Sequence, residues 1–418
     1  VRGRRQRQMC IRDSSNEGML KHVYRRGLAE RYGKAMQCIA GIHYNFSLPE
    51  AIWQHLEPSI EDAKERQSVG YMSLIRNFKR QSWLLMYLFG ASPIINRSFV
   101  GQAPHQLLDF DDSSLYLPYA TSLRMSDLGY TSEAQANIRT CYNRIESYVS
   151  LIYNAVTRPW PAYEKIGTHR DGEWIQLNTN MLQIENEYYA GIRPKRTTKP
   201  GERPNNALIK RGVQYVEVRC MDVDPFETTG ISSQSAYFLD TFLLYCAVSH
   251  SPRFDAEDDC DETDNNFKQV VTEGRKPGLT LQRHGQPITL KAWGLEIIEA
   301  LAPYAELLDK VYQTTAHRQA LAAQQAKLED IALTPAARYQ QAVRDSGLSF
   351  NEFTKQNSLQ HSDRLRALKL PAEVKQALVA ESEASLQSYP AKEKSDTMSF
   401  DDYLRDFETS LVDPEAAS

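Results

Sequence analysis

The chain has 418 residues, of which 41% are hydrophobic, so it is long enough to bury one large core or two smaller ones. Its 49 lysines and arginines are nearly balanced by 53 aspartates and glutamates, and the formal net charge is only −4. This balance gives no reason to expect a nucleic-acid or membrane-surface partner, so we expect small-molecule ligands. The sequence has no run of 18 apolar residues, and we expect a cytoplasmic location.

Residues 1–13 differ in composition from the rest of the chain. They carry five arginines against one acid and follow neither a helical nor a strand period. We therefore expect a basic extension that is foreign to the rest of the protein. The six cysteines show no Cys-x-x-Cys spacing, which argues against a zinc site.

The first part of the chain predicts two helices with a strand between them. Apolar residues recur at three- and four-residue steps over 18–33 and again over 68–89, which is the period of a helix. Alternation over 35–48 predicts a strand that places His43 and Asn45 on one face.

The middle of the chain predicts one helix followed by two strands. Ser132 and Gln135 form a capping-box pattern ahead of a long apolar period, which predicts one continuous helix as far as Ile152. Polar and apolar residues then alternate over 174–187 and over 213–220, which predicts two strands. The first of these strands would carry its acidic side chains on one face.

The remaining segments predict mostly helices. A helix fits 236–248, whereas 255–264 holds seven acids in ten residues and lacks the glycine of an EF-hand loop, so we expect a solvated loop there. Glycine and proline within 273–281 predict a structured turn. From about residue 288 onward the composition predicts helices that end in a polar tail.

The strand over 213–220 has the pattern best suited to chemistry. Its two-residue period places Tyr215, Glu217 and Arg219 on one face, with apolar side chains on the other. A carboxylate and a guanidinium whose backbones lie about 7 Å apart can serve a metal and a phosphate side by side. The alternative is an ordinary surface ion pair, which the pattern alone favours.

Nucleotide binding by a common phosphate loop is excluded by the sequence. The chain contains neither a Gly-x-x-x-x-Gly-Lys-Ser/Thr loop nor a Gly-x-Gly-x-x-Gly motif. A nucleotide would therefore need another kind of site.

Four segments, read together and in order, closely resemble glutamate-cysteine ligase of the proteobacterial type. The first reads Gly-Ile-His-Tyr-Asn-Phe-Ser-Leu-Pro, and the four segments are 41–49, 119–130, 178–196 and 215–226. The resemblance implies an α/β (α+β) fold like that of glutamine synthetase, with a curved, mainly antiparallel sheet, flanking helices and a helical C-terminal region. We expect a partial catalytic domain over 14–286 and a helical region with a polar tail over 287–418.

The resemblance also implies the reaction, which opens glutathione biosynthesis. ATP phosphorylates the γ-carboxylate of glutamate, and the amine of cysteine displaces the phosphate from γ-glutamyl phosphate. The expected cofactor is Mg²⁺, with Mn²⁺ as the alternative, and ATP is a co-substrate. The expected partners are ATP, L-glutamate and L-cysteine, without nucleic acid or membrane, and the expected oligomeric state is a monomer.

Site residues follow from the same resemblance, position by position. Catalytic roles fall to His43, Glu217 and Arg219, of which His43 and Glu217 would also hold the metal. Five residues would frame the pocket for cysteine, with a guanidinium gripping its carboxylate: Tyr24, Ile39, Arg124, Tyr130 and Tyr189. Two residues of the basic loop would contact the nucleotide: Arg193 and Arg196.

The chain departs from the family at its beginning. The metal-binding Glu-Arg-Glu motif of the family has no counterpart here. We therefore expect that the N-terminal quarter of the enzyme is missing and that residues 1–13 are a scar. Two alternatives remain, namely another carboxylate-amine ligase of the same fold and an inactive fragment that still binds substrate.

Overall fold

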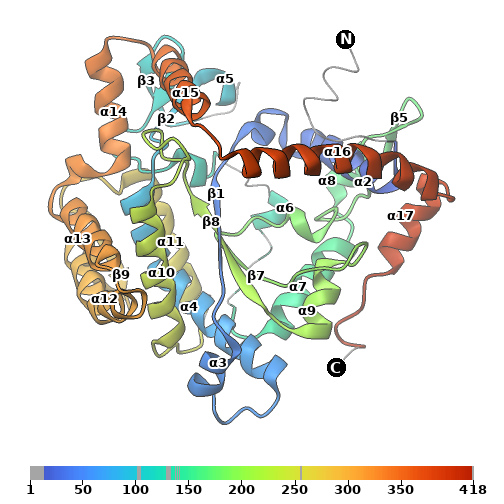
Figure 1. Cartoon of the computed structure of the whole chain (residues 1–418), viewed down its shortest axis with the longest axis horizontal. Helices are drawn as coiled ribbons and strands as arrows, with labels where there is room; N and C mark the ends of the chain where they lie inside the picture. Colours follow the sequence, from blue (N-terminus) through green and yellow to red (C-terminus); the bar gives the residue numbers. More distant parts are fainter. Residues whose placement is uncertain are drawn as a thin grey trace.

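The computed structural model describes residues 14–100, 105–128, 133–136, 138, 140, 142–254 and 257–416. Helices dominate it, and every ladder between its named strands is antiparallel. The expected fold class, helices around mainly antiparallel strands, is therefore confirmed. In Figure 1 the strands β1, β8 and β7 run through the middle of the molecule, with helices on both sides.

The α-helices are α2 (Asn16–Tyr32), α3 (Glu50–Leu56), α4 (Ala63–Phe89), α5 (Arg97–Val100), α6 (Glu133–Ala136), α7 (Ile145–Thr157), α8 (Pro161–Ile166), α9 (Pro204–Arg211), α10 (Ser233–Val248), α11 (Glu257–Glu273), α12 (Leu290–Tyr312), α13 (Ala316–Glu329), α14 (Pro335–Ser346), α15 (Phe350–Ala367), α16 (Ala372–Ser395) and α17 (Phe400–Thr409). The 3₁₀ helices are η1 (Ala35–Cys38), η2 (Leu123–Met125), η3 (Glu185–Glu187) and η4 (Ile331–Leu333). The strands are β1 (Ile42–Phe46), β2 (Ile94–Asn96), β3 (Leu108–Asp111), β4 (Ser114–Tyr116), β5 (His169–Arg170), β6 (Glu173–Trp174), β7 (Ile192–Lys195), β8 (Tyr215–Met221), β9 (Thr280–Arg283) and β10 (Gln286–Thr289).

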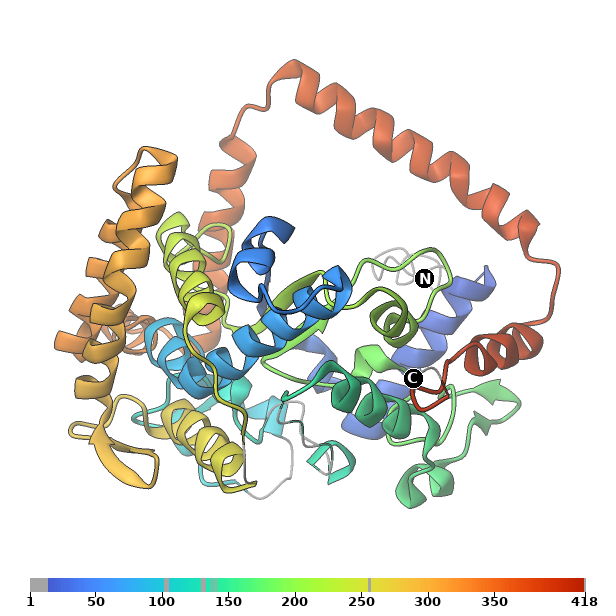
Figure 2. The same cartoon turned by 90° about the horizontal axis from the view of Figure 1, so that it is seen from below.

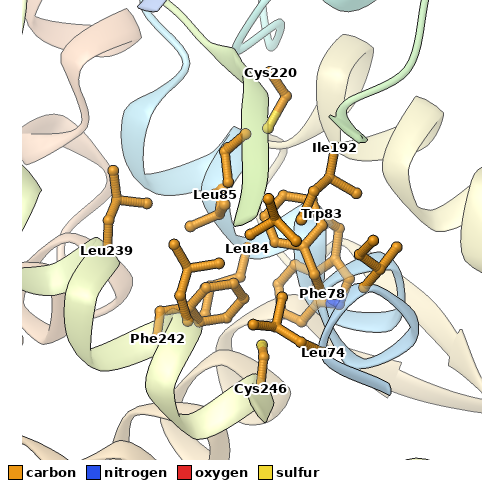
Figure 3. Packing of buried hydrophobic residues seen from close by; sticks show 14 of the residues in the cluster. Leu74, Phe78, Trp83, Leu84, Leu85, Ile192, Cys220, Leu239, Phe242 and Cys246 are labelled. Atoms are coloured by element: carbon orange, nitrogen blue, oxygen red, sulfur yellow. The ribbon is translucent and has the colours of Figure 1, made fainter. Parts of the chain in front are cut away.

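Helix α4 is the centre of the main hydrophobic core. Asp62 caps its first turn by accepting a hydrogen bond from the Glu65 amide, and the helix ends at Gly90. Its C-terminal half is buried on nearly every side, as expected for a helix that is apolar all round. Figure 3 shows Leu84 and Leu85 of α4 among side chains from α10, β7 and β8.

The site is positioned by a three-stranded sheet in the order β1–β8–β7. Val216 and Val218 are fully buried on the side of the sheet that packs against α4, while Glu217 and Arg219 alternate with them. The predicted alternation of this strand is confirmed. The strand predicted over 35–48 is shorter, because a 3₁₀ turn precedes β1.

The continuous helix predicted from the capping box to Ile152 is wrong. The structure has a short helix α6 and a separate helix α7 whose N-cap is Arg144, while Ser132 lies outside the described residues. Tyr142 has a φ of 54°, a left-handed conformation that interrupts a helix. The Tyr142 carbonyl accepts a hydrogen bond from Arg76 Nη1 instead of from a helical amide.

The strand predicted over 174–187 is also wrong, since only Glu173–Trp174 are in a strand and 185–187 form η3. Side-chain oxygens replace a neighbouring strand as acceptors, because the Gln183 amide donates to Glu187 Oε2 at 2.7 Å. Glu187 and Glu185 are buried rather than lined up on one face of a strand, and each pairs with an arginine on another segment.

The solvated acidic loop predicted over 255–264 is likewise wrong from residue 257 onward, because that part forms the beginning of α11. Residues 255–256 lie outside the described part of the chain. Acidic side chains near a helix N-terminus are stabilised by the helix dipole. In addition, Asp264 pairs with Lys79, and Glu262 accepts from the His284 and Gly285 amides.

The last third of the chain is helical. Helices α12 and α13 pack on each other and on α10, whereas α16 buries none of its residues and runs apart from the body in Figure 2. The division of the chain at residues 286 and 287 stays a prediction. Within the described residues, none of the helices has the length and apolar character needed to cross a membrane.

Candidate functional site

Polar side chains cover the face of the β1–β8–β7 sheet that points away from α4. The register places Asn45 of β1 and Arg193 of β7 opposite Glu217 on the central strand. Side chains that lie opposite each other in a ladder share a face. The polar face, as we call it below, consists of His43, Asn45, Arg193, Lys195, Glu217 and Arg219.

Glu217 lies at the centre of the polar face and contacts three basic groups. Its Oε1 is 3.4 Å from His43 Nδ1, and its Oε2 is 3.5 Å from Lys195 Nζ and 3.7 Å from Arg219 Nε. One carboxylate therefore offsets only part of the positive charge on this face. Such an excess favours a polyanion such as a nucleotide phosphate.

The protonation states of His43 and Arg219 suit the binding of a metal and of an anion, respectively. Burial lowers the pKa of His43 below its usual 6.5, and Arg219 lowers it further against the opposing effect of Glu217. The imidazole is therefore neutral at pH 7, which is the form that binds a metal. Burial, followed by Arg193, lowers the pKa of Arg219 to about 10, so it remains charged at pH 7.

A β-bulge shapes the polar face where β1 meets β8. The register shifts between Ile42 and Tyr44, so that two residues of β8, Arg219 and Cys220, lie opposite His43 alone. A bulge of this kind bends a strand and redirects its side chains, and bulges recur next to active sites.

A second cluster forms around Arg124, at the end of β8. Its Nε donates to Asp222 Oδ1 at 2.6 Å, its Nη1 to the Tyr189 hydroxyl at 3.2 Å, and its Nη2 to the Cys220 carbonyl at 2.6 Å. Three of its five N–H groups are thereby used, which leaves one on each Nη atom. The side chains of Arg124 and Asp222 are only 9% and 2% exposed, so this ion pair is fixed in place.

The segment Gly-Ile-His begins with glycine because the backbone of Gly41 lies close to the side chain of Arg124. A Cβ at this position would lie 2.6 Å from Arg124 Nη1, so only glycine lets the backbone approach the guanidinium. The half-buried Ile39 lies two residues upstream on the same segment. Ile39, Arg124 and Tyr189 are thus brought into one region.

Tyr189 links this cluster to the polar face. Its hydroxyl accepts the Arg124 hydrogen bond, and the guanidinium of Arg219 lies 5.7 Å from the centre of its ring. The two clusters are therefore neighbours, so that groups bound at each of them could be held close together.

The remaining predicted site residues lie as follows. Tyr24 packs against the apolar cluster around Leu20 and Leu177, and Tyr130 lies outside the described residues. Arg196 donates to the carbonyls of Arg211 and Gly212 at the end of α9, away from Glu217. Arg193, in contrast, lies on the polar face and is 5% exposed.

Sequence reasoning missed Lys195, Asn45 and Asp222 as site residues. The two-residue spacing of Lys195 from Arg193 would have placed it on the same face of β7, and Asn45 is spaced in the same way from His43. Asp222 carried no such local signal, because its partners lie 98 and 131 positions away in the chain.

The donors available for a metal are few in the part of the chain that the structure describes. No group of three or more His, Cys, Asp or Glu side chains is arranged to hold a metal there. Among the described residues, His43 and Glu217 supply one nitrogen and one carboxylate at 3.4 Å from each other.

Comparison with known proteins gives consistent matches. A family model described as glutamate-cysteine ligase matches residues 5–270. Proteins named glutamate–cysteine ligase are 55% identical over 404 residues in Bordetella petrii and 54% identical over 404 residues in Azotobacter vinelandii. These matches cover 96% and 95% of this chain, respectively, and 76% of each relative.

Two solved structures are also similar. A glutamate–cysteine ligase from Francisella tularensis, in complex with AMP, gives a TM-score of 0.89 at 36% identity, covering 97% of this chain and 79% of that chain. A bifunctional glutathione synthetase from Pasteurella multocida gives a TM-score of 0.57 at 22% identity, covering 81% of this chain and 39% of that one, and supports the fold alone.

Proposed function

The chain belongs to the glutamate-cysteine ligase family, and we propose that its catalytic centre is the polar face, with His43, Glu217 and Arg219 in the catalytic roles. As a member of this family, the protein is an ATP-dependent ligase that joins glutamate to cysteine in glutathione biosynthesis. The observation that carries the proposed site is the contact of Glu217 with three basic groups on one sheet face.

The polar face would act on the first half of the reaction, in which a γ-carboxylate oxygen of glutamate attacks the γ-phosphorus of ATP. The bond from that phosphorus to ADP breaks as the new P–O bond forms, and negative charge spreads over the phosphoryl oxygens. Arg219, Lys195 and Arg193 lie where they can stabilise this charge, and their burial strengthens the effect.

The metal is proposed on the same face. His43 and Glu217 would hold Mg²⁺, or Mn²⁺, through a neutral imidazole nitrogen and a carboxylate oxygen. A bound ion would supply further charge neutralisation for the phosphates. The predominance of basic groups around a single carboxylate suits the phosphates of ATP, whose oxygens would supply further ligands to a metal bound with them.

The second half of the reaction would use the Arg124 cluster. The cysteine amine attacks the acyl carbon of γ-glutamyl phosphate, and inorganic phosphate leaves. We propose that the two N–H groups left on Arg124 bind the cysteine carboxylate, while Ile39 and Tyr189 line the pocket, together with Tyr24 and Tyr130. Asp222 holds the guanidinium in the orientation this contact requires.

The nucleotide contacts are proposed to come from Arg193 and Lys195, with Arg196 in a lesser part. Arg193 belongs to the polar face, and its Nη2 is held by the Asn186 carbonyl. Arg196 would first have to leave the carbonyls at the end of α9. Variants of Arg193 and of Arg196 should therefore differ in their effect on ATP binding.

The experiment that tests this proposal is ADP release by the 418-residue chain with Mg-ATP, glutamate and cysteine, omitting each amino acid in turn. We expect release at the full rate only when both amino acids are present. Replacement of cysteine by other amines at equal rates would favour a different carboxylate-amine ligase. Absence of ADP release under every condition would contradict a functional centre in this chain.

A further inference from the structure

A second basic cavity lies away from the polar face. It has a volume of about 540 Å³ and is bounded by helix α14, by η4 and by the segments that follow β4, β8 and α11. The residues that matter for the argument are Pro118, Phe226, Arg275, Arg338, Gln340 and Arg344. None of its lining residues belongs to the polar face or to the Arg124 cluster.

Arg275 is the buried element of this cavity, at 8% exposure. Its Nε donates to the Ala120 carbonyl at 2.9 Å, and its Nη2 donates to the Pro118 carbonyl at 2.8 Å and to Gln340 Oε1. Its Nη1 has no hydrogen-bond partner among the described residues, yet it is not sealed from solvent. No described carboxylate lies within 4.0 Å of the guanidinium.

Arg275 is buried, lacks an acidic partner and has an unused N–H group, and two other buried arginines help to interpret these features. Arg76 also lacks an acidic partner, but each of its three nitrogens donates to a carbonyl or hydroxyl oxygen, so its role is structural. Arg193 leaves its Nη1 without a partner and lies on the polar face, where we place the phosphates. Arg275 resembles Arg193 in this respect rather than Arg76. The Nη1 of Arg275 is open to solvent, so an anion in the cavity could accept hydrogen bonds from it.

Arg338 and Arg344 bring two further guanidiniums to the cavity. Arg338 stacks 4.6 Å from the centre of the Phe226 ring, and Arg344 lies 5.6 Å from that of Phe110. Neither has a carboxylate within 4.0 Å among the described residues, and their side-chain N–H groups make no hydrogen bonds there. Stacking fixes the plane of a guanidinium while leaving its N–H edge free for an anion.

The charges around the cavity also favour the binding of an anion. Burial, followed by the nearby Arg344, lowers the pKa of Arg275 to about 10. Three arginines face a single acid, Asp345, which accepts a hydrogen bond from Gln341. The cavity therefore holds an excess of positive charge that the described residues do not neutralise.

We infer that this cavity is a second anion-binding site, which takes a small molecule carrying at least two phosphate or carboxylate groups. The planar fork of a guanidinium matches the oxygens of both groups. The cavity volume lies within the roughly 300–1,000 Å³ of small-molecule sites. The site is separate from the polar face, so its occupant does not compete with ATP.

The test is calorimetric titration of the 418-residue chain with pyrophosphate and, separately, with citrate. The polar face also attracts pyrophosphate, so we expect two pyrophosphate ions per wild-type chain. The double variant Arg338→Gln/Arg344→Gln changes two exposed side chains and should fold normally by circular dichroism. In this variant the affinity of the arginine cavity should fall at least 10-fold, so that only the ion on the polar face binds at the concentrations that fill both sites of the wild type.

A matched control separates this site from a general loss of charge. Arg364→Gln/Arg366→Gln removes the same charge from exposed positions on α15 and should titrate like the wild type. Lys195→Gln should weaken the other ion and spare this one. Tighter binding of pyrophosphate or of citrate assigns the ligand to phosphates or carboxylates, respectively. Equal titration curves for the wild type and the Arg338→Gln/Arg344→Gln variant, or equal losses in the α15 control, would overturn the inference.

A second variant addresses the buried residue. Arg275→Lys keeps the charge but loses the fork, and it should lower the affinity of the same site about 10-fold. If this variant does not fold, the double variant of exposed arginines still decides the question.

Discussion

Replacement of Asp222 by asparagine should weaken cysteine binding without altering the polar face. Asp222 accepts four hydrogen bonds, from the Ala91 amide, the Ser92 and Ser122 hydroxyls and Arg124 Nε. An asparagine amide offers one oxygen in place of two, so some of these donors would lose their acceptor. Burial lowers the pKa of Arg124, and the charge and hydrogen bond of Asp222, together with Tyr189 and Cys220, more than offset this. The variant therefore leaves a buried cation without its acid.

The size of the effect follows from the burial of the pair. Breaking a buried ion pair from one side costs about 3–5 kcal/mol, and exposures of 9% and 2% leave little solvent to reduce that figure. Losing one charge-assisted hydrogen bond to a substrate carboxylate costs about 1.5–3 kcal/mol, or roughly 10- to 100-fold in affinity. We therefore expect Asp222→Asn to melt at a lower temperature and to raise the KM for cysteine by roughly 10- to 100-fold.

The assay is ADP release at saturating ATP and glutamate with cysteine varied, followed by the same assay with ATP varied. The KM for ATP should change less than threefold, about 0.6 kcal/mol, since Asp222 contacts none of the polar-face side chains. Asp402→Asn is the control, because Asp402 pairs with Arg405 at the surface, where an ion pair contributes little. A folded Asp222→Asn protein with an unchanged KM for cysteine would refute the reasoning.

Three further predictions concern other parts of the molecule. Gly41→Ala should raise the KM for cysteine in initial-rate assays, because its Cβ would lie 2.6 Å from Arg124 Nη1; an unchanged KM would show that the guanidinium is free to move. Lys195→Gln should raise the KM for ATP by more than Arg196→Gln does, since only Lys195 contacts Glu217; the reverse order would assign the nucleotide to the α9 side. Asp309→Asn should lower the melting temperature at pH 7, because His317 and Arg318 donate to this buried carboxylate and, against the opposing effect of burial, lower its pKa to about 2. A depressed pKa contributes stability above about pH 4 that is lost as the pH falls toward 2, so melting curves of wild type and variant should converge in that range; a constant difference would contradict the assignment.

The sequence was most informative where a local period decides the structure. The alternation of Glu217 and Arg219 with buried valines was predicted correctly, since one buried face fixes which residues turn outward. The helix over 68–89 was also predicted, apart from its first turn, because its apolar residues follow the helical period. The family resemblance, carried by four long segments, supplied the reaction that the periodicity did not contain.

What could not be predicted depends on contacts between distant segments. Glu185 and Glu187 read as one face of a strand, but the structure buries them against Arg203 and Arg31, and no local period signals such partners. The break before α7 is fixed by Arg76, which takes up carbonyls that a continuous helix would have used. The partnership of Asp222 with Arg124 likewise spans 98 positions and forms only when the fold is complete.

The most direct test of the catalytic centre is the single-turnover formation of ADP by a Glu217→Gln variant with Mg-ATP, glutamate and cysteine. Removing one electrostatic group from such a centre costs roughly 100- to 1,000-fold in rate. We expect a loss of that size, while the melting temperature stays close to that of the wild type and the exposed control Glu173→Gln retains full activity. A folded Glu217→Gln protein with a near-normal rate would contradict the placement of the catalytic centre on the β1–β8–β7 sheet.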